Sequence, residues 1–537
     1  MRRNESGITI EVVQSFCSIR EPLVEKSLER HYGSYRKRAM LTPEQPTRIC
    51  ATKGERVAAV LAIGLCAAVL IRRLISVSVA AGIPPGVACT TGCEEASFNA
   101  LWDVIHGAPL YPDPRRIPFA SSYFNWLFYV GYAALIRPYV AGYTGQSIVV
   151  VGRLVTLSAA VVGSMFLVRT AVQRLGATWT TASLCAATLF FGPLVGWWIL
   201  TVRPDLWALA LAAAGAYVLI ARGDRLGFLP VLPAALFFFL AWSMKPSVVL
   251  SFASVIVWLL LRREFRAAAL LGGVFAALCA SAMAFLGPAF RFSMVHMAEG
   301  STYDVGSGIS NLKDAVVKAL PLEVLALPGL WLVVRRARAQ SGAVPWACLT
   351  LGSVGIAITV PMSAVTSCKD GAWSNYFFES ALMATLVAIG GCSAGIRVFP
   401  KFAIAAAFLL AAGQALVVTG RVGVIDLEPS ARELAQRWQA WKDEPQPRFS
   451  ADLRLNLPWI SPGSEGFVLA YNYARDRERG IPFENGGIRG LISKGYFKAL
   501  MLQGDLTSFD GADLSGYRVV DRSMGMGILE LTHKAAH

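Results

Sequence analysis

The chain has 537 residues, of which 55% are hydrophobic and 16% are charged, and its mean hydropathy is +0.50. Soluble globular proteins carry about 25% charged residues, so this composition excludes an ordinary soluble protein. The formal net charge of +15 does not indicate a nucleic-acid-binding protein, because the Lys and Arg residues cluster between apolar segments, where positive charge fixes membrane topology.

Apolar runs recur from residue 57 to residue 419, and each is close to the ~20 residues that cross a bilayer as a helix. The runs are continuously apolar rather than alternating, which excludes a membrane β-barrel. We therefore predict an α-helical polytopic membrane protein with about 11–13 transmembrane helices, followed by a small soluble α/β domain at residues 420–537.

Residues 1–56 are polar and basic, without a secretory signal pattern, so we expect a cytoplasmic tail. The first span, residues 57–83, leads to an outer loop at residues 84–120. In this loop Glu94 and Glu95 open a helical pattern over residues 94–106, whose apolar face suits a membrane surface. Either carboxylate could act as a general base towards an acceptor hydroxyl. The alternative is a solvated first turn, in which the carboxylates offset the helix dipole.

The charged residues between the later spans form two sets. One set is plainly basic and the other consists of short mixed motifs, so the positive-inside rule places the first set in the cytoplasm and the second outside. This assignment requires residues 121–168 to make one or three net crossings, which gives an odd total and puts residues 420–537 outside. The basic set is Arg169/Arg174, Arg222/Arg225, Arg262/Arg263/Arg266, Arg335/Arg336/Arg338 and Arg397/Lys401.

Two mixed motifs stand at the ends of spans. In Arg203-Pro204-Asp205 the carboxylate either caps the helix that follows or, beside Arg203, holds a phosphate or orients a sugar. Lys245, directly before Pro246, is either a point charge for a phosphate or an interface lysine.

A third motif, residues 369–379, leads into another span. Lys369 is the candidate phosphate ligand, and Asn375, Tyr376 and Glu379 enter the apolar run. An ionisable Glu inside such a run is costly and suggests function, and positions 375 and 379 share one face of a helix. The alternative is hydrogen bonding between helices.

The cysteines and histidines give no metal-ligand spacing. Cys89 and Cys93 flank the first-loop carboxylates and form either a disulfide or two separate thiols. His296 falls in the loop that we expect at residues 288–318.

The C-terminal segment mixes helix and strand patterns. Residues 429–442 read as an amphipathic helix, and residues 465–472, 497–502 and 517–520 are strand candidates. Glycines between them mark turns.

In this order the motifs resemble the GT-C superfamily of membrane glycosyltransferases, and more narrowly the bacterial, family 39-related branch of protein O-mannosyltransferases and lipid-A aminoarabinose transferases. The resemblance covers most of residues 57–500. It rests on Glu94-Glu95-Ala96, Gly107-Ala108-Pro109-Leu110-Tyr111, Tyr123-Phe124-Asn125, Arg153, Arg203-Pro204-Asp205, Lys245-Pro246, Lys369-Asp370-Gly371, Asn375-Tyr376, Gly466-Phe467-Val468-Leu469 and Gly486-Gly487-Ile488.

The resemblance implies inverting transfer of a sugar from a polyprenyl-phosphate donor to a glycan, lipid or protein acceptor at the outer face of the cytoplasmic membrane. The base role falls on Glu94, with Glu95 as the alternate because the family usually has other pairs there, and Asp205 matches a functional Asp of some members. Arg203, Lys245 and Lys369 would hold the donor phosphate, and the substrate-binding candidates are Tyr123, Asn125, Asn375, Tyr376 and Glu379. Some members bind a divalent metal, but this sequence shows no convincing ligand set.

The competing interpretation is a polytopic transporter or flippase. Transporters show internal repeats and broken, charged helices at the membrane midplane, whereas this sequence has no clear repeat and its polar motifs stand at span ends.

Overall fold

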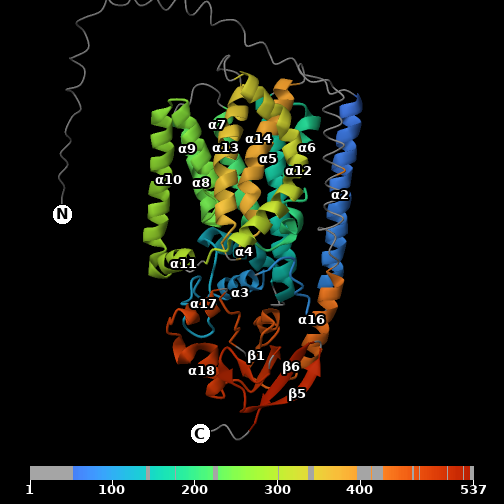
Figure 1. Ribbon diagram of the computed structural model, residues 1–537, viewed down its shortest axis with the longest axis vertical. Coiled ribbons are helices and arrows are strands. Elements are labelled where there is room, and N and C mark those ends of the chain that lie inside the picture. Colours follow the sequence, from blue (N-terminus) through green and yellow to red (C-terminus); the bar gives the residue numbers. More distant parts are fainter. Residues whose placement is uncertain are drawn as a thin grey trace, which may run out of the picture. The chain divides into compact units, whose positions relative to one another are not determined.

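The computed structural model describes residues 53–532, apart from 93, 141–144, 176, 222–227, 300–301, 337–343, 370, 396–412, 414–426, 463–464, 471, 505 and 524. The described chain is mostly helical, with a small C-terminal sheet domain, and this confirms the predicted fold class (Figure 1). The last predicted apolar run, which ends at residue 419, lies outside the described residues except for Gly413.

Five of the described helices are long and apolar enough to cross a membrane: α2 (Lys53–Ala81), α5 (Gly145–Leu175), α10 (Phe265–Phe285), α12 (Val305–Arg336) and α13 (Val344–Thr366). Four shorter apolar helices pack with them: α6 (Trp179–Phe190), α7 (Asp205–Ile220), α8 (Phe228–Met244) and α9 (Leu250–Leu261). With α14 (Phe378–Gly395) these helices run side by side as one bundle (Figure 1).

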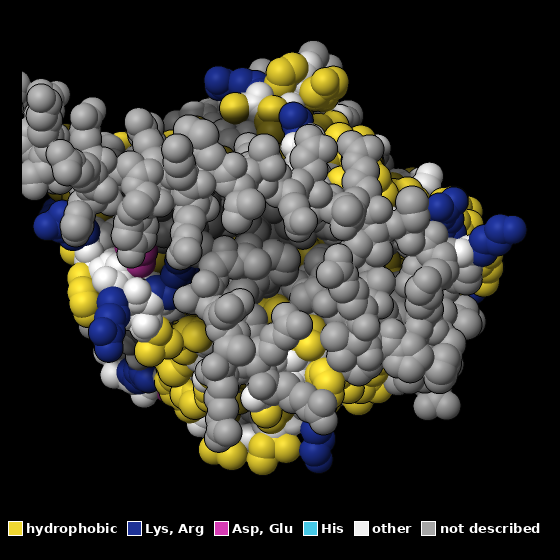
Figure 2. All heavy atoms as spheres, turned by 90° about the horizontal axis from the view of Figure 1, so that it is seen from above, with side chains coloured by type: hydrophobic (Ala, Val, Ile, Leu, Met, Phe, Trp, Pro, Cys, Tyr) yellow, Lys and Arg dark blue, Asp and Glu magenta, His cyan; other side chains and the backbone are white. Residues whose placement is uncertain are grey.

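Residues 121–168 hold one short helix and one long helix. The 11 residues of α4 (Trp126–Ile136) reach about 16 Å at 1.5 Å per residue, roughly half of the hydrocarbon layer, whereas the 31 residues of α5 are more than long enough to cross it. At the end of the bundle away from the sheet domain, Lys and Arg side chains are spread around the rim (Figure 2).

Our prediction of a loop at residues 288–318 is wrong. The segment forms α11 (Gly287–Glu299), and α12 begins at Val305. The charged residues near position 314 mark where α12 becomes polar and not where it ends. A pair between Lys318 Nζ and Asp314 Oδ2, 2.7 Å apart and four residues apart in sequence, suits a helix surface.

Small residues let α12 and α14 approach closely. A Cβ atom added to Gly391 would lie 2.5 Å from the Cα of Gly329, and one added to Gly329 would lie 2.4 Å from the carbonyl oxygen of Val387. Glycine is therefore required at this crossing, as is common where transmembrane helices pack.

The C-terminal domain begins with α16 (Glu428–Trp441), which confirms the predicted amphipathic helix. Its four-stranded sheet has the order β1-β2-β6-β5: β1 (Arg448–Ser450) is parallel to β2 (Ala499–Gln503), and β6 (Met526–Leu531) is antiparallel to β2 and to β5 (Tyr517–Ser523). A two-stranded sheet of β3 (Ser508–Phe509) and β4 (Ala512–Asp513) and the helices α17 (Tyr473–Glu478) and α18 (Gly487–Ser493) complete the domain.

The strand that we predicted at residues 465–472 is wrong, because the described part of this segment is an irregular chain. Its apolar side chains serve a different purpose. Phe467 packs in the core of the domain, and Ala470 N donates 2.8 Å to the carbonyl oxygen of Phe119 in the first loop.

The first loop joins the two parts of the chain. Its helix α3 (Glu94–Ile105) confirms the predicted helix and lies between the bundle and the sheet domain (Figure 1). The apolar face of α3 contributes Phe98 and Leu101 to a cluster that also contains Leu455 of the C-terminal domain. Farther along the loop, Phe119 is fully buried in that domain's own core.

Candidate active site

The first-loop carboxylate Glu94 is completely buried and all of its acceptor capacity is used. Oε2 accepts from Thr90 N (2.7 Å), from Thr90 Oγ1 (3.1 Å) and from an Nη of Arg153 (3.3 Å). Oε1 accepts from Val202 N (2.8 Å) and from Arg153 Nε (3.5 Å). These five contacts, two of them from the Arg153 guanidinium, occupy both oxygens of Glu94 and leave no lone pair free for an acceptor hydroxyl.

Glu95 has a different environment. Its side chain is half-buried. Among the described residues its carboxylate accepts hydrogen bonds from the Cys89 thiol, 3.6 Å away, and from the backbone N–H of Glu95 itself. Burial raises the pKa of Glu95, the neighbouring Glu94 charge adds to the rise, and the Arg454 guanidinium of the C-terminal domain opposes it. A raised pKa and open acceptor capacity are what a general base at neutral pH needs.

The predicted disulfide alternative falls partly outside the described residues, since Cys93 is among those left out. Cys89 is a free thiol and donates to Glu95. The guanidinium of Arg454, whose charge acts on Glu95, is fixed by two hydrogen bonds to the carboxylate of Asp452, each 2.8 Å long.

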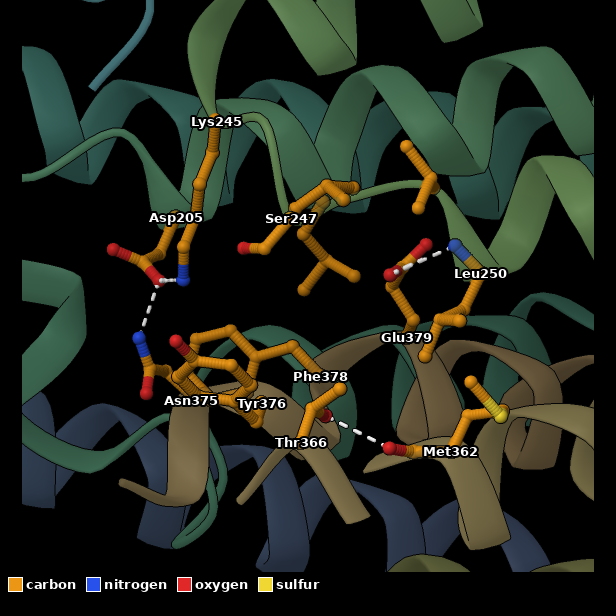
Figure 3. Close-up of a pocket in the computed structure, with 13 residues that line it drawn as sticks. Asp205, Lys245, Ser247, Leu250, Met362, Thr366, Asn375, Tyr376, Phe378 and Glu379 are labelled. Carbon is orange, nitrogen blue, oxygen red and sulfur yellow. Dashed lines mark hydrogen bonds and ion pairs between the residues drawn. The ribbon is translucent and has the colours of Figure 1, made fainter. Parts of the chain in front are cut away.

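A second polar centre lies among the transmembrane helices, where the structure brings together three of the predicted residues (Figure 3). Lys245 Nζ, just beyond the end of α8, is 2.5 Å from Asp205 Oδ1, on the first residue of α7. Asn375 Nδ2 donates to the same oxygen at 2.7 Å. All three side chains are buried. Asp205 therefore does not cap its own helix but orients a lysine and an amide from two other segments.

Arg203 lies between Asp205 and the first loop and contacts both. Its Nε is 3.7 Å from Asp205 Oδ2, and one Nη donates to Gly92 O of the first loop at 3.0 Å. The guanidinium lies 5.1 Å from the ring centre of Phe124 and 4.9 Å from that of Trp198. Asp205 Oδ2 is buried and accepts no hydrogen bond from the described residues.

A cavity of about 240 Å³ opens beside Lys245 (Figure 3). This volume is somewhat below the ~300–1,000 Å³ of most small-molecule sites. Polar residues stand at its two ends, and its walls between them are largely apolar. The lining residues are Asp205, Leu209, Lys245, Ser247, Val248, Val249, Leu250, Met362, Thr366, Asn375, Tyr376, Phe378 and Glu379.

Glu379 lies at the end of the cavity opposite Lys245 (Figure 3). It accepts from Ser251 N at 2.7 Å and from Leu250 N at 3.2 Å, and so supplies the cap that the start of α9 lacks. Our expectation that Asn375 and Glu379 act from one helical face is wrong. Asn375 belongs to the 3₁₀ turn η3 (Ser374–Phe377) before α14, whose tighter winding turns it towards Asp205.

The remaining candidates surround this centre. The ring of Tyr376 lies 5.2 Å from Lys245 Nζ. Lys369 is half-buried, and burial lowers the pKa of its ammonium, as do the positive charges of Arg475 and Lys245. These cations therefore gather on one side of the bundle, while the neighbouring Asp370 lies outside the described residues.

The cavity lining includes neither the first-loop carboxylates Glu94 and Glu95 nor the candidates Tyr123 and Asn125, which follow the loop. Asn125 is fully buried and donates to the carbonyl oxygen of Trp242 near the end of α8, and its own Oδ1 has no hydrogen-bond partner among the described residues. Tyr123 is half-buried and packs against the cluster that contains α3.

Metal ligands are scarce in the part of the chain that the structure describes. No group of three or more His, Cys, Asp or Glu side chains comes together there.

Arg153 is one of the motif residues, but the sequence did not show that it pairs with Glu94. Arg153 lies within α5 and is 3% exposed. A buried charge inside an apolar span is costly unless it is paired, so this residue by itself signalled that a carboxylate had to face it. Which carboxylate it would be could not be read from the sequence.

The chain matches no family model and no curated protein. Among solved structures it is similar to ArnT from Cupriavidus metallidurans in the apo state, with a TM-score of 0.54 and 12% identity over 88% of this chain and 98% of that one. It is also similar to the Archaeoglobus fulgidus oligosaccharyltransferase in the apo form, with a TM-score of 0.50 and 12% identity over 81% of this chain and 69% of that one. The chain therefore has a GT-C-like fold, as its motifs predicted.

Proposed function

We propose that this protein transfers a sugar from a polyprenyl-phosphate donor to a hydroxyl of a glycan, lipid or protein acceptor, at the outer face of the cytoplasmic membrane and with inversion. The observation that carries the proposal is the cavity in which a buried Lys–Asp–Asn centre adjoins apolar walls. The GT-C-like fold and the membrane helices support it.

In this proposal the donor phosphate meets Lys245, with Arg203 and Lys369 nearby. Lys245 Nζ has three protons, and Asp205 takes one of them. The remaining protons are available to phosphate oxygens, while the apolar walls accept the first isoprene units of the lipid. A lipid-linked donor presents its phosphate at headgroup level, so no nucleotide-binding motif is needed.

The base is assigned to Glu95, because the oxygens of Glu94 are occupied. Glu95 takes the proton of the acceptor hydroxyl while the oxygen of that hydroxyl forms a bond to the anomeric carbon. The bond from that carbon to the phosphate oxygen breaks, and the polyprenyl phosphate leaves with the electron pair. Lys245 stabilises the charge that develops on the phosphate.

The test compares the wild type, Glu95→Gln and the matched control Glu478→Gln, an exposed residue of α17. Each purified protein is mixed with radiolabelled polyprenyl-phosphate sugars and with glycan, lipid and peptide acceptors. We expect Glu95→Gln to lower kcat by about 10²–10⁴-fold, the usual contribution of a general base, with unchanged donor binding. Normal turnover in Glu95→Gln would refute the assignment of the base.

The pH dependence gives a second readout. A base must be deprotonated to act, so turnover falls as the pH drops through its pKa. Because burial raises the pKa of Glu95, this loss should occur above the usual Glu value of about 4.3, and it should be missing from the residual rate of Glu95→Gln. Movement of intact donor across vesicle membranes, without any product, would favour the transporter instead.

A further inference from the structure

The contacts of Glu94 connect three segments that are distant in sequence. Glu94 accepts from the backbone N–H groups of Thr90 and Val202. Its partner Arg153 also donates to the carbonyl oxygen of Ala88, at 2.5 Å. Thr90 Oγ1 in turn lies 2.6 Å from Thr201 Oγ1. One buried carboxylate thus ties the start of the first loop to α5 and to the residues just before α7.

The segment at the far end of these bonds carries the proposed phosphate site. Val202, whose N–H is held by Glu94, directly precedes Arg203 and lies three residues before Asp205. Arg203 adds a bond back to Gly92 O of the first loop. On the near end, Glu94 is the chain neighbour of Glu95. Any shift of this carboxylate would therefore move the base and the phosphate site relative to each other.

We propose that Glu94 and Arg153 are a pair of positioning residues that hold the base on Glu95 in register with the Arg203–Asp205–Lys245 centre. Glu94 is then not itself the base. This inference rests on the proposed function for its catalytic consequence, but the bonds themselves can be tested without turnover.

The pair is suited to this role by its burial. Side-chain exposure is 4% for Arg153 and 0% for Glu94. Water cannot replace a lost bond there, and a buried charge without its partner is strongly unfavourable. The amide of Gln at position 94 would also point N–H groups at N–H donors, because a carboxylate accepts on both oxygens and an amide on only one.

The first experiment measures hydrogen–deuterium exchange in detergent for the full chain. In Glu94→Gln and in Arg153→Met we expect faster exchange of the Thr90 and Val202 amides, which have lost their acceptor or its fixed orientation. Glu95→Gln is the matched control and should leave both amides as in the wild type. Unchanged exchange in Glu94→Gln would overturn the positioning role, whatever reaction the protein performs.

The second experiment separates positioning from base catalysis. A positioning role predicts that Glu94→Gln weakens donor binding at least tenfold and lowers kcat, while the acid limb of the pH profile stays in place. If Glu94 were the base, kcat would fall with donor affinity intact and the acid limb would disappear, which would overturn the proposal. If the wild type binds no polyprenyl-phosphate donor, the proposed function fails, and the exchange experiment still decides the role of the pair.

A milder variant protects the test against misfolding. Thr90→Val keeps the shape of the side chain and removes only the hydroxyl that bridges Glu94 and Thr201. We expect the same direction of change in amide exchange and in donor affinity, about two- to tenfold in affinity, because the hydroxyl takes part in two hydrogen bonds. Wild-type exchange and affinity in a folded Thr90→Val would count against the proposal.

Discussion

Replacing Lys245 by Met separates the structural from the catalytic role of the buried Lys–Asp pair. The substitution removes the charge and keeps an unbranched side chain. It leaves Asp205 with the amide of Asn375 at 2.7 Å and with the guanidinium of Arg203 at 3.7 Å. Breaking a buried ion pair by removing one partner costs about 3–5 kcal/mol. Because two partners remain, we expect a loss near the lower end, about 3 kcal/mol.

The double variant Lys245→Met/Asp205→Asn removes both charges and should recover most of that stability. Replacement of a whole buried pair by neutral groups is often close to neutral, and an Asn at position 205 can still pair with Asn375. Turnover should not recover, because no ammonium faces the donor phosphate. One charge-assisted contact is worth about 1.5–3 kcal/mol, so kcat/KM should fall by about 10–150-fold in both variants.

The assays are thermal unfolding in detergent and turnover with a radiolabelled polyprenyl-phosphate sugar. Arg518→Met is the control, since it breaks an exposed pair with Glu530, in which the side chains are 70% and 33% exposed, and should change unfolding by less than about 1 kcal/mol. The reasoning is refuted if the double variant regains wild-type turnover, or if Lys245→Met unfolds at the wild-type temperature.

Two further predictions concern the first loop. Phe119→Ala should destabilise the C-terminal domain by about 3–5 kcal/mol, since the Phe119 ring is fully buried in the core of that domain. The control is Phe285→Ala, at an 88% exposed position of α10. Equal unfolding temperatures for the two variants would contradict the stabilising role of Phe119. Burial raises the pKa of Asp103 to about 6, so the folded state prefers the protonated form and loses stability as the pH rises from about 4 to 6. Asp103→Asn should therefore be more stable than the wild type by about 1–2 kcal/mol at pH 7, after allowance for partial exposure, with no difference below about pH 4; thermal unfolding at both pH values measures this, and a less stable variant at pH 7 would contradict it.

Sequence patterns alone predicted several apolar helices, the amphipathic helix that begins at Glu94, a helix within one residue of the bounds of α16, and two of the four strands of the main sheet. These features depend on local patterns: the length of an apolar run, a period of 3.6 residues, or glycines between β-rich segments. It also located the motifs that meet at the cavity, because charged residues at the ends of apolar runs stand out against their surroundings.

The pairs that side chains form with one another could not be predicted and were found only in the folded chain. Asp205 and Lys245 are 40 residues apart and Asp205 and Asn375 are 170 apart, and neither distance in sequence indicates a contact. The two adjacent carboxylates of the first loop look equivalent in the sequence, yet one is enclosed by Arg153, Thr90 and Val202 and the other is left with open acceptor capacity. Pairing depends on how helices are rotated and packed against each other. Contacts across the whole bundle fix this packing, and the order of neighbouring residues does not reveal it.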